Sequence, residues 1–141
     1  MLDKFIKKSK DRKRNLDSLI NESVLEISAP IFKEFEASMA YYRCAIMEVE
    51  TKLRVLNEEF SLENDRNPIV NIQSREKSLL SIKEKLERFD KPFTVESIEE
   101  NLYDVAGLRV ICSFPEDVYL VAHALLSQDD ITLIKKKDYI E

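Results

Sequence analysis

The sequence has 141 residues, of which 44% are hydrophobic and 35% are charged, and its formal net charge is −5. This length and composition are typical of a globular, helix-rich protein with one domain, or one small domain and an appendage. The two cysteines, Cys44 and Cys112, are far apart and indicate neither a disulfide framework nor a metal knuckle. The longest uncharged run, residues 118–128, is too short to span a membrane, and the N-terminus lacks the apolar segment of a secretion signal. We therefore expect a cytoplasmic protein.

Positive charge is concentrated at the N-terminus. Residues 1–14 contain seven Lys or Arg and two Asp or Glu, whereas the remainder is acidic. The apolar spacing over residues 2–27 predicts a charged helix. A basic arm on an acidic body can contact RNA or another anionic surface, and the same charges also suit the solvated start of a helix. The sequence leaves both interpretations open.

A second helix is predicted over residues 30–60, after the Ser28-Ala29-Pro30 break. Its apolar positions alternate spacings of three and four residues, which is a heptad seam. They are Phe32, Phe35, Met39, Tyr42, Ile46, Val49, Leu53, Leu56 and Phe60. Such a seam is typical of a helix that mediates self-association, giving a homo-oligomer, and equally of a long helix that packs across its own domain.

The polar segment 62–68 ends in proline and is the predicted domain boundary. It divides the chain into an N-terminal helical segment, residues 1–60, and a second domain, residues 61–141. The second domain opens with a predicted strand at 69–73 and a predicted helix at 75–88. On that helix one row is formed by Lys77, Ser81, Lys85 and Arg88. Three cations and a hydroxyl could hold a polyphosphate, and interspersed glutamates make an ordinary salt-bridged surface the alternative.

A predicted strand near residues 104–112 mixes core residues with Asp104 and Arg109. It also contains Gly107, the only glycine in the chain. A glycine inside a strand indicates a β-bulge, or a backbone that a ligand or another element approaches closely. Because strand side chains alternate, Asp104 and Arg109 should face opposite ways unless Asp104 precedes the strand or Gly107 is a bulge.

Three further elements complete the predicted fold. Thr94 is predicted to cap a short helix. Pro115 and the acidic residues after it predict another helix, with Val118, Val121, Ala122, Leu125 and Leu126 as its buried stripe. His123 has no partner residues at metal-ligand spacing and is interpreted as a packed or surface histidine. A last strand is predicted at 131–135, so the fold class is α+β, with long N-terminal helices followed by a small mixed sheet and flanking helices.

Three motifs in this order resemble the RelA/SpoT-type alarmone synthetase domain, in particular its small single-domain members. They are Arg75-Glu76-Lys77 with Ser81 and Lys85, the run from Asp104 to Arg109, and Lys137-Asp138-Tyr139-Ile140. The resemblance spans residues 67–141. It implies a nucleotidyltransferase-like fold and a GTP pyrophosphokinase, which moves pyrophosphate from ATP to the 3′-hydroxyl of GDP or GTP to make the guanosine tetra- and pentaphosphates of the stringent response.

The resemblance also implies roles for individual residues. Arg75 and Arg109 would stack on the adenine of ATP, and Lys77, Ser81 and Lys85 would hold its phosphates. Asp104 would ligate the Mg²⁺ that bridges them.

In the family, an Asn-Gly-Tyr loop that holds the guanine nucleotide and a later acidic residue follow the third motif, and this chain stops at Glu141, before both. No residue is therefore assigned as catalytic, and we expect the 141 residues to form no alarmone on their own. The alternative function is a non-catalytic nucleotide-binding or helix-mediated interaction module.

Overall fold

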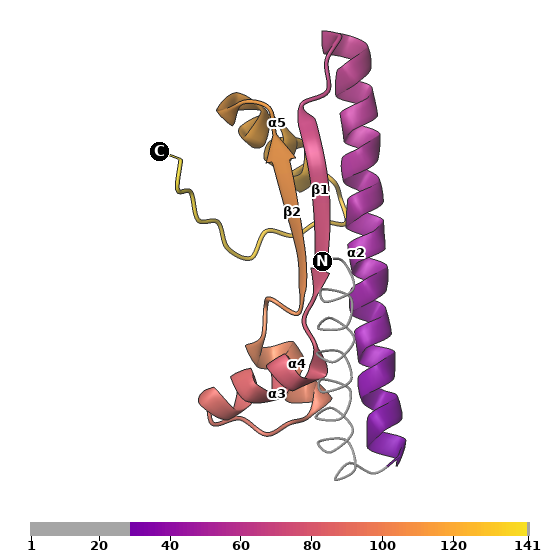
Figure 1. The fold of residues 1–141 in the computed structure, drawn as a ribbon, viewed down its shortest axis with the longest axis vertical. Helices are drawn as coiled ribbons and strands as arrows, with labels where there is room; N and C mark the ends of the chain where they lie inside the picture. The colour runs from indigo at the N-terminus through magenta and orange to yellow at the C-terminus, as the bar shows by residue number, and fades with distance from the viewer. Residues whose placement is uncertain (1–28, 141) are drawn as a thin grey trace, which may run out of the picture. The chain divides into compact units, whose positions relative to one another are not determined.

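The computed structural model describes residues 29–140, so the predicted helix at 2–27 and the basic N-terminus lie outside the described residues. The described part is α+β, as predicted (Figure 1). Its elements in chain order are α2 (Ala29–Asn64), β1 (Ile69–Glu76), α3 (Leu79–Arg88), α4 (Val95–Asn101), β2 (Ala106–Cys112) and α5 (Pro115–Leu126). They form two compact units. Within the described residues, unit 1 holds 29–41 and 77–105, and unit 2 holds 42–76 and 106–140.

The predicted seam of α2 is buried within the chain. The buried positions are Phe35, Met39, Ile46, Leu53 and Leu56, and the other four seam residues are half-buried. Packing inside the chain therefore accounts for the heptad pattern, as expected of a long helix that lies across its own domain. A homo-oligomer through this helix stays a prediction.

Unit 1 combines the first turns of α2 with α3 and α4. The ring of Phe35 stacks on that of Phe93, with centroids 4.5 Å apart. Ile82 and Leu86 of α3 and Ile98 of α4 are fully buried. Each short helix begins at a hydroxyl cap: Ser78 Oγ accepts the amide of Ser81 in α3, and Thr94 caps α4 as predicted.

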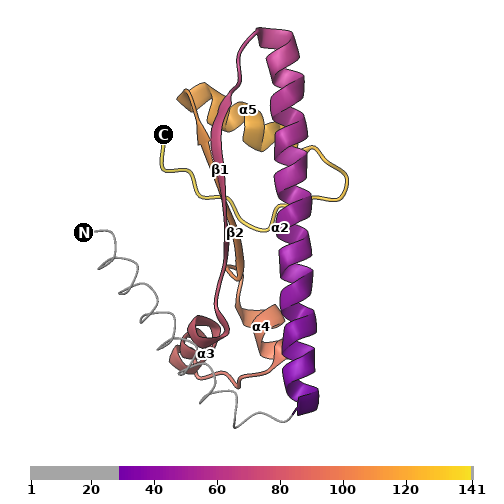
Figure 2. The same cartoon turned by 45° about the vertical axis from the view of Figure 1, so that its right-hand side comes forward.

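Unit 2 is built on an antiparallel pair of strands, β1 and β2, which lie side by side in Figure 1. One face of this sheet packs on a core formed by Leu53 of α2, Ile69 of β1 and Val121 of α5. Half-buried residues around that core include Val49, Phe60, Ile72, Leu108, Val110, Cys112 and Leu125. Figure 2 shows α5 at the same end of the unit as the turn that joins α2 to β1.

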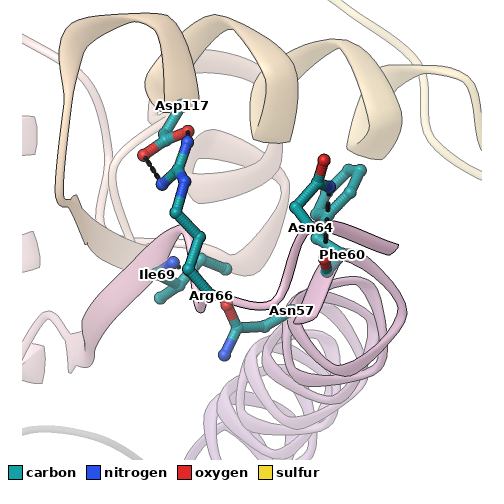
Figure 3. A network of polar contacts seen from close by, with 6 residues as sticks. All are labelled: Asn57, Phe60, Asn64, Arg66, Ile69 and Asp117. Carbon is teal, nitrogen blue, oxygen red and sulfur yellow. Dashed lines mark hydrogen bonds and ion pairs between the residues drawn. The ribbon is translucent and has the colours of Figure 1, made fainter. Parts of the chain in front are cut away.

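That turn is fixed by side-chain hydrogen bonds (Figure 3). Asn57 Oδ1 accepts the backbone amide of Ile69 at 3.0 Å. Both terminal nitrogens of Arg66 donate to the carboxylate of Asp117, at 2.7 Å each. Asp117 is 2% exposed and lies in the first turn of α5. The predicted boundary segment 62–68 is therefore an ordered connection within unit 2.

The strand β1 is longer than predicted, and the helix after it starts later. Arg75 and Glu76 pair with Gly107 and Ala106 instead of opening a helix. The amide of Lys77 then donates to Val105 O at 2.7 Å, which prolongs the pairing by one residue. The charge of Arg75 is accommodated in the strand because its side chain lies on the solvent-exposed face of the sheet. In the sequence alone, these charged residues look like the start of a helix. The predicted row of Lys77, Ser81, Lys85 and Arg88 on one helix is accordingly wrong for Lys77, which precedes α3.

The conflict over Asp104 and Arg109 is resolved because β2 begins at Ala106, so Asp104 precedes the strand. The register shift between β1 and β2 lies between Ile69 and Asn71. A bulge at Gly107 is therefore wrong.

Two predictions for the C-terminal part also fail. The stripe of α5 is buried only at Val121 and half-buried at Leu125, while Val118, Ala122 and Leu126 are exposed. Residues 131–140 contain no strand, so the expected mixed sheet is a two-stranded antiparallel sheet within the described residues. A strand needs a neighbour for its backbone groups, and the 131–135 segment pairs with neither β1 nor β2.

Candidate functional site

A cluster of two lysines and one aspartate lies in unit 1. Lys77, just before α3, and Lys85, two turns into it, both contact Oδ2 of Asp104, at 2.7 and 2.8 Å. The cap at Ser78 starts α3 immediately after Lys77, and this start brings Lys85 back to the same carboxylate. The two lysines predicted to bind phosphate thus both contact the aspartate predicted to bind the metal.

The cluster carries a net positive charge. Hydrogen bonds from Lys77 and then from Lys85 lower the pKa of Asp104 to about 2, so the carboxylate is ionised at neutral pH. One negative charge faces two positive ones, and an anion is the ligand that completes this balance. The side chain of Lys77 is 13% exposed and that of Asp104 is 50% exposed, so the carboxylate is accessible from solvent while the first lysine is held in place.

Ser81 lies one turn before Lys85 and is half-buried. Its hydroxyl accepts a hydrogen bond from Ser78 Oγ at 2.9 Å, and its amide is the one that Ser78 caps. The structure therefore gives Ser81 a local role at the start of α3. In the sequence it lies midway between Lys77 and Lys85. A hydroxyl retains a donor hydrogen in this arrangement, which can reach an external acceptor.

The two predicted arginines lie on the exposed face of the sheet in unit 2. Arg75 is directly opposite Gly107, and Gln73 is directly opposite Arg109. Alternating residues of a strand share a face, so Arg75 and Arg109 are diagonal neighbours on one face, at a typical separation of about 7–8 Å. Both are exposed. A planar ring stacked between two flat guanidinium groups needs about 7 Å, twice the contact distance of about 3.5 Å between non-bonded atoms.

The residues of the cluster also fit a divalent cation in one limited way. Both lysine contacts are with Oδ2 of Asp104, which leaves Oδ1 as the oxygen that could ligate a metal. In residues 29–140 no group of three or more His, Cys, Asp or Glu is placed to hold a metal. One carboxylate is compatible with Mg²⁺ that is held mainly by substrate phosphates and water. His123, interpreted from the sequence as a packed or surface residue, is exposed.

Sequence reasoning missed two features. Gln73 lies on the same sheet face as Arg75 and Arg109. Had β1 been predicted to extend to residue 76, the alternation of strand side chains would have placed Gln73 on that face. The Arg66 and Asp117 pair joins positions 51 residues apart, and no local pattern links them. Both features depend on tertiary structure or on an exact strand boundary.

Comparison with known proteins agrees with the three motifs. Residues 74–141 match the family described as the region found in RelA / SpoT proteins. The GTP pyrophosphokinases YwaC and YjbM of Bacillus subtilis (strain 168) are each 34% identical to this chain, over 111 and 108 residues. These matches cover 79% and 77% of this chain but 53% and 50% of the relatives, so the chain spans about half of their length.

Solved structures give the same result. The chain is similar to small alarmone synthetase 1 from Bacillus subtilis bound to its product pppGpp, with a TM-score of 0.67 and 34% identity over 77% of this chain and 55% of that one. The same enzyme bound to AMPCPP gives a TM-score of 0.65. A GTP pyrophosphokinase family protein from Streptococcus pneumoniae gives 0.67, with 36% identity over 76% of this chain and 52% of that one. Residues 74–141 are therefore similar to the region found in RelA / SpoT proteins, and the likeness to the synthetases covers about half of each relative.

Proposed function

We propose that this chain supplies the ATP-binding half of a pyrophosphotransferase that moves pyrophosphate from ATP to the 3′-hydroxyl of GDP or GTP. The observation that carries the proposal is the convergence of Lys77 and Lys85 on Asp104, within a region that matches RelA / SpoT proteins. Two relatives of this region are GTP pyrophosphokinases, and a similar enzyme was solved with pppGpp and with AMPCPP.

The cluster in unit 1 is proposed to bind the phosphates of ATP. Lys77 and Lys85 would act as point charges toward phosphate oxygens, and Ser81 would donate its hydroxyl hydrogen. Asp104 would hold Mg²⁺ through one carboxylate oxygen. When bound, that ion would neutralise charge on the phosphate chain. If Lys77 and Lys85 exchanged their contacts with Asp104 for contacts with phosphate oxygens, each ammonium group would still face a negative charge.

The exposed sheet face in unit 2 is proposed to bind the adenine ring, between the guanidinium groups of Arg75 and Arg109. Cationic planar groups stack favourably on aromatic rings.

The transfer requires no covalent bond between the protein and the pyrophosphoryl group. The 3′-hydroxyl oxygen of the acceptor attacks the β-phosphorus of ATP, and the bond between that phosphorus and the oxygen of the α-phosphate breaks, so that AMP leaves. The hydroxyl proton goes to a base that we do not assign within residues 29–140. Positioning and charge stabilisation supply most of the catalysis in such reactions, and the residues named above provide them on the donor side.

Several finer statements stay predictions. They concern a cytoplasmic location, a homo-oligomer and RNA contact. On the first, the structure adds only that none of the helices in residues 29–140 is long and apolar enough to cross a membrane.

The proposal is tested by following label from ATP carrying ³²P in its β-phosphate into a guanine nucleotide, with GDP and Mg²⁺, using the full-length product of the gene. Asp104→Asn keeps the side-chain shape and removes the charge, so transfer should fall by more than about tenfold, a loss of about 1.4 kcal/mol of transition-state stabilisation. Lys83→Ala is the matched control, because Lys83 lies on α3 but outside the cluster. Transfer that survives Asp104→Asn within tenfold would refute the assignment.

A further inference from the structure

Gly107 is the only glycine of the chain, and nothing in the described part of the structure requires a glycine at this position. Its φ is not positive, so the backbone conformation is open to any residue. Among residues 29–140, a Cβ built at this position would meet only Arg75 O, at 3.8 Å, which is ordinary van der Waals contact. A side chain would therefore fit within the described residues, and it would also strengthen the strand, because glycine weakens a strand interior.

The position of Gly107 shows what a side chain there would face. It lies directly opposite Arg75 and two residues before Arg109, so its missing side chain would point from the same exposed face. These residues and Gln73, which faces Arg109, form a square on that face. The two arginines occupy one diagonal, and Gly107 and Gln73 occupy the other.

We infer that Gly107 is a specificity-determining residue that keeps the floor of the adenine site open. This inference rests on the proposed function. A ring held between Arg75 and Arg109 stands over the centre of the square, and a side chain at Gly107 would project into the space that the edge of the ring occupies. The glycine thus exchanges strand stability for a close approach of a flat ligand to the backbone.

Size should therefore matter in a graded way at this one position. Alanine adds a methyl group beside the ring, and valine adds a branched group that stands upright from the sheet. Both substitutions should leave the thermal midpoint of unfolding unchanged or raise it, since each suits an extended strand better than glycine does. Loss of nucleotide binding together with retained stability is a signature that a merely structural glycine would not give.

Asn71→Val is a matched control on the same face of β1. Asn71 is exposed and faces Ile111, four residues from Arg75, or about 13 Å along the strand. The Asn71→Val substitution therefore introduces the same branched side chain on the same sheet face as Gly107→Val does, but outside the square.

The experiment titrates Mg·ATP and Mg·tripolyphosphate into the 141-residue chain, its two Gly107 variants and the Asn71→Val control, with circular dichroism melting of each protein. Tripolyphosphate has the phosphates but no ring. We expect Gly107→Val to weaken ATP binding by at least about tenfold and Gly107→Ala by less, with tripolyphosphate binding within about twofold throughout.

The outcomes separate the two claims. If the unsubstituted chain fails to bind ATP, the proposed function and this inference both fail. If it binds ATP and Gly107→Val binds equally well, only the inference is overturned. Equal losses of ATP and tripolyphosphate, or an equal loss of ATP in the Asn71→Val control, also overturn it, because the effect would not be specific to the ring.

Discussion

Arg66 binds Asp117 through two hydrogen bonds of 2.7 Å each, and it does so from a surface position to a buried one. The arginine side chain is 47% exposed, whereas the aspartate side chain is 2% exposed. The hydrogen bonds from Arg66 lower the pKa of Asp117. The pair connects the turn after α2 to the first turn of α5, the two segments that flank the core of unit 2.

Removing Arg66 should destabilise the protein clearly, because a buried carboxylate would lose its partner. We expect Arg66→Ala to lower the melting temperature by about 5 °C or more. Arg54→Ala, which breaks the exposed pair with Glu50, is the control and should change it by less than about 2 °C. Adding Asp117→Asn to Arg66→Ala should cost less than Asp117→Asn alone; equal costs would show that the two residues are not coupled.

The charge on Asp104 should make stability depend on pH only under acidic conditions. Its folded pKa, about 2, lies below the ordinary value of 3.8, so its contribution is present above about pH 4 and is lost as pH falls toward 2. The difference in unfolding free energy between the unsubstituted chain and Asp104→Asn should therefore be constant from about pH 5 to 8 and should shrink below about pH 4. Urea unfolding at several pH values measures it. A difference that changed between pH 6 and 8 would mean that another group titrates with the cluster.

Truncation to alanine should destabilise the protein strongly on the buried face of α2 and only slightly on its exposed face. Leu53 is 1% exposed in the core of unit 2, and Leu53→Ala should cost about 2–5 kcal/mol of unfolding free energy. Val55 is 51% exposed, and Val55→Ala should cost less than about 0.5 kcal/mol. Chemical unfolding of both variants checks this. Similar costs at the two positions would mean that the helix buries a different face, or that residue 55 is covered in solution.

The lysine pair should make metal binding depend on the nucleotide. Two ammonium groups already contact Asp104, so free Mg²⁺ meets local positive charge, and we expect it to bind at least about tenfold more weakly than it does with ATP present. Replacing Lys77 and Lys85 together by Met should improve binding of the free metal and weaken that of Mg·ATP. Calorimetric titration with each ligand distinguishes these effects. Parallel losses for both ligands would show that the lysines support the fold of the cluster instead.

Local patterns predicted most of the elements from the sequence. The heptad spacing located α2, and the proline at 115 and the cap at Thr94 located two helix starts, because these signals act over a few residues. The end of β1 could not be predicted in this way. Arg75 and Glu76 are strand residues because of their partners in β2, which are about 30 positions away, and pairing of that kind leaves no local signal.

The candidate site shows the same limit. The resemblance to the synthetase family implied that Lys77, Lys85 and Asp104 lie close together, but their contact through one oxygen depends on where α3 starts. The segment at 131–135 has the composition of a strand and forms none in the described structure, because strand propensity takes effect only when a neighbouring strand is available. Sequence therefore predicted which charged residues lie together better than it predicted the backbone that holds them; their roles toward a ligand stay predictions.

The most direct test of the central claim, that these residues form the ATP-binding part of a synthetase, is calorimetric titration of Mg·AMPCPP into the 141-residue chain. We expect saturable binding to the unsubstituted chain and losses of at least about tenfold in Asp104→Asn, Lys85→Ala and Arg109→Ala, with Lys83→Ala unchanged within about twofold. Absence of binding to the folded chain, or equal affinity in all four variants, would contradict it.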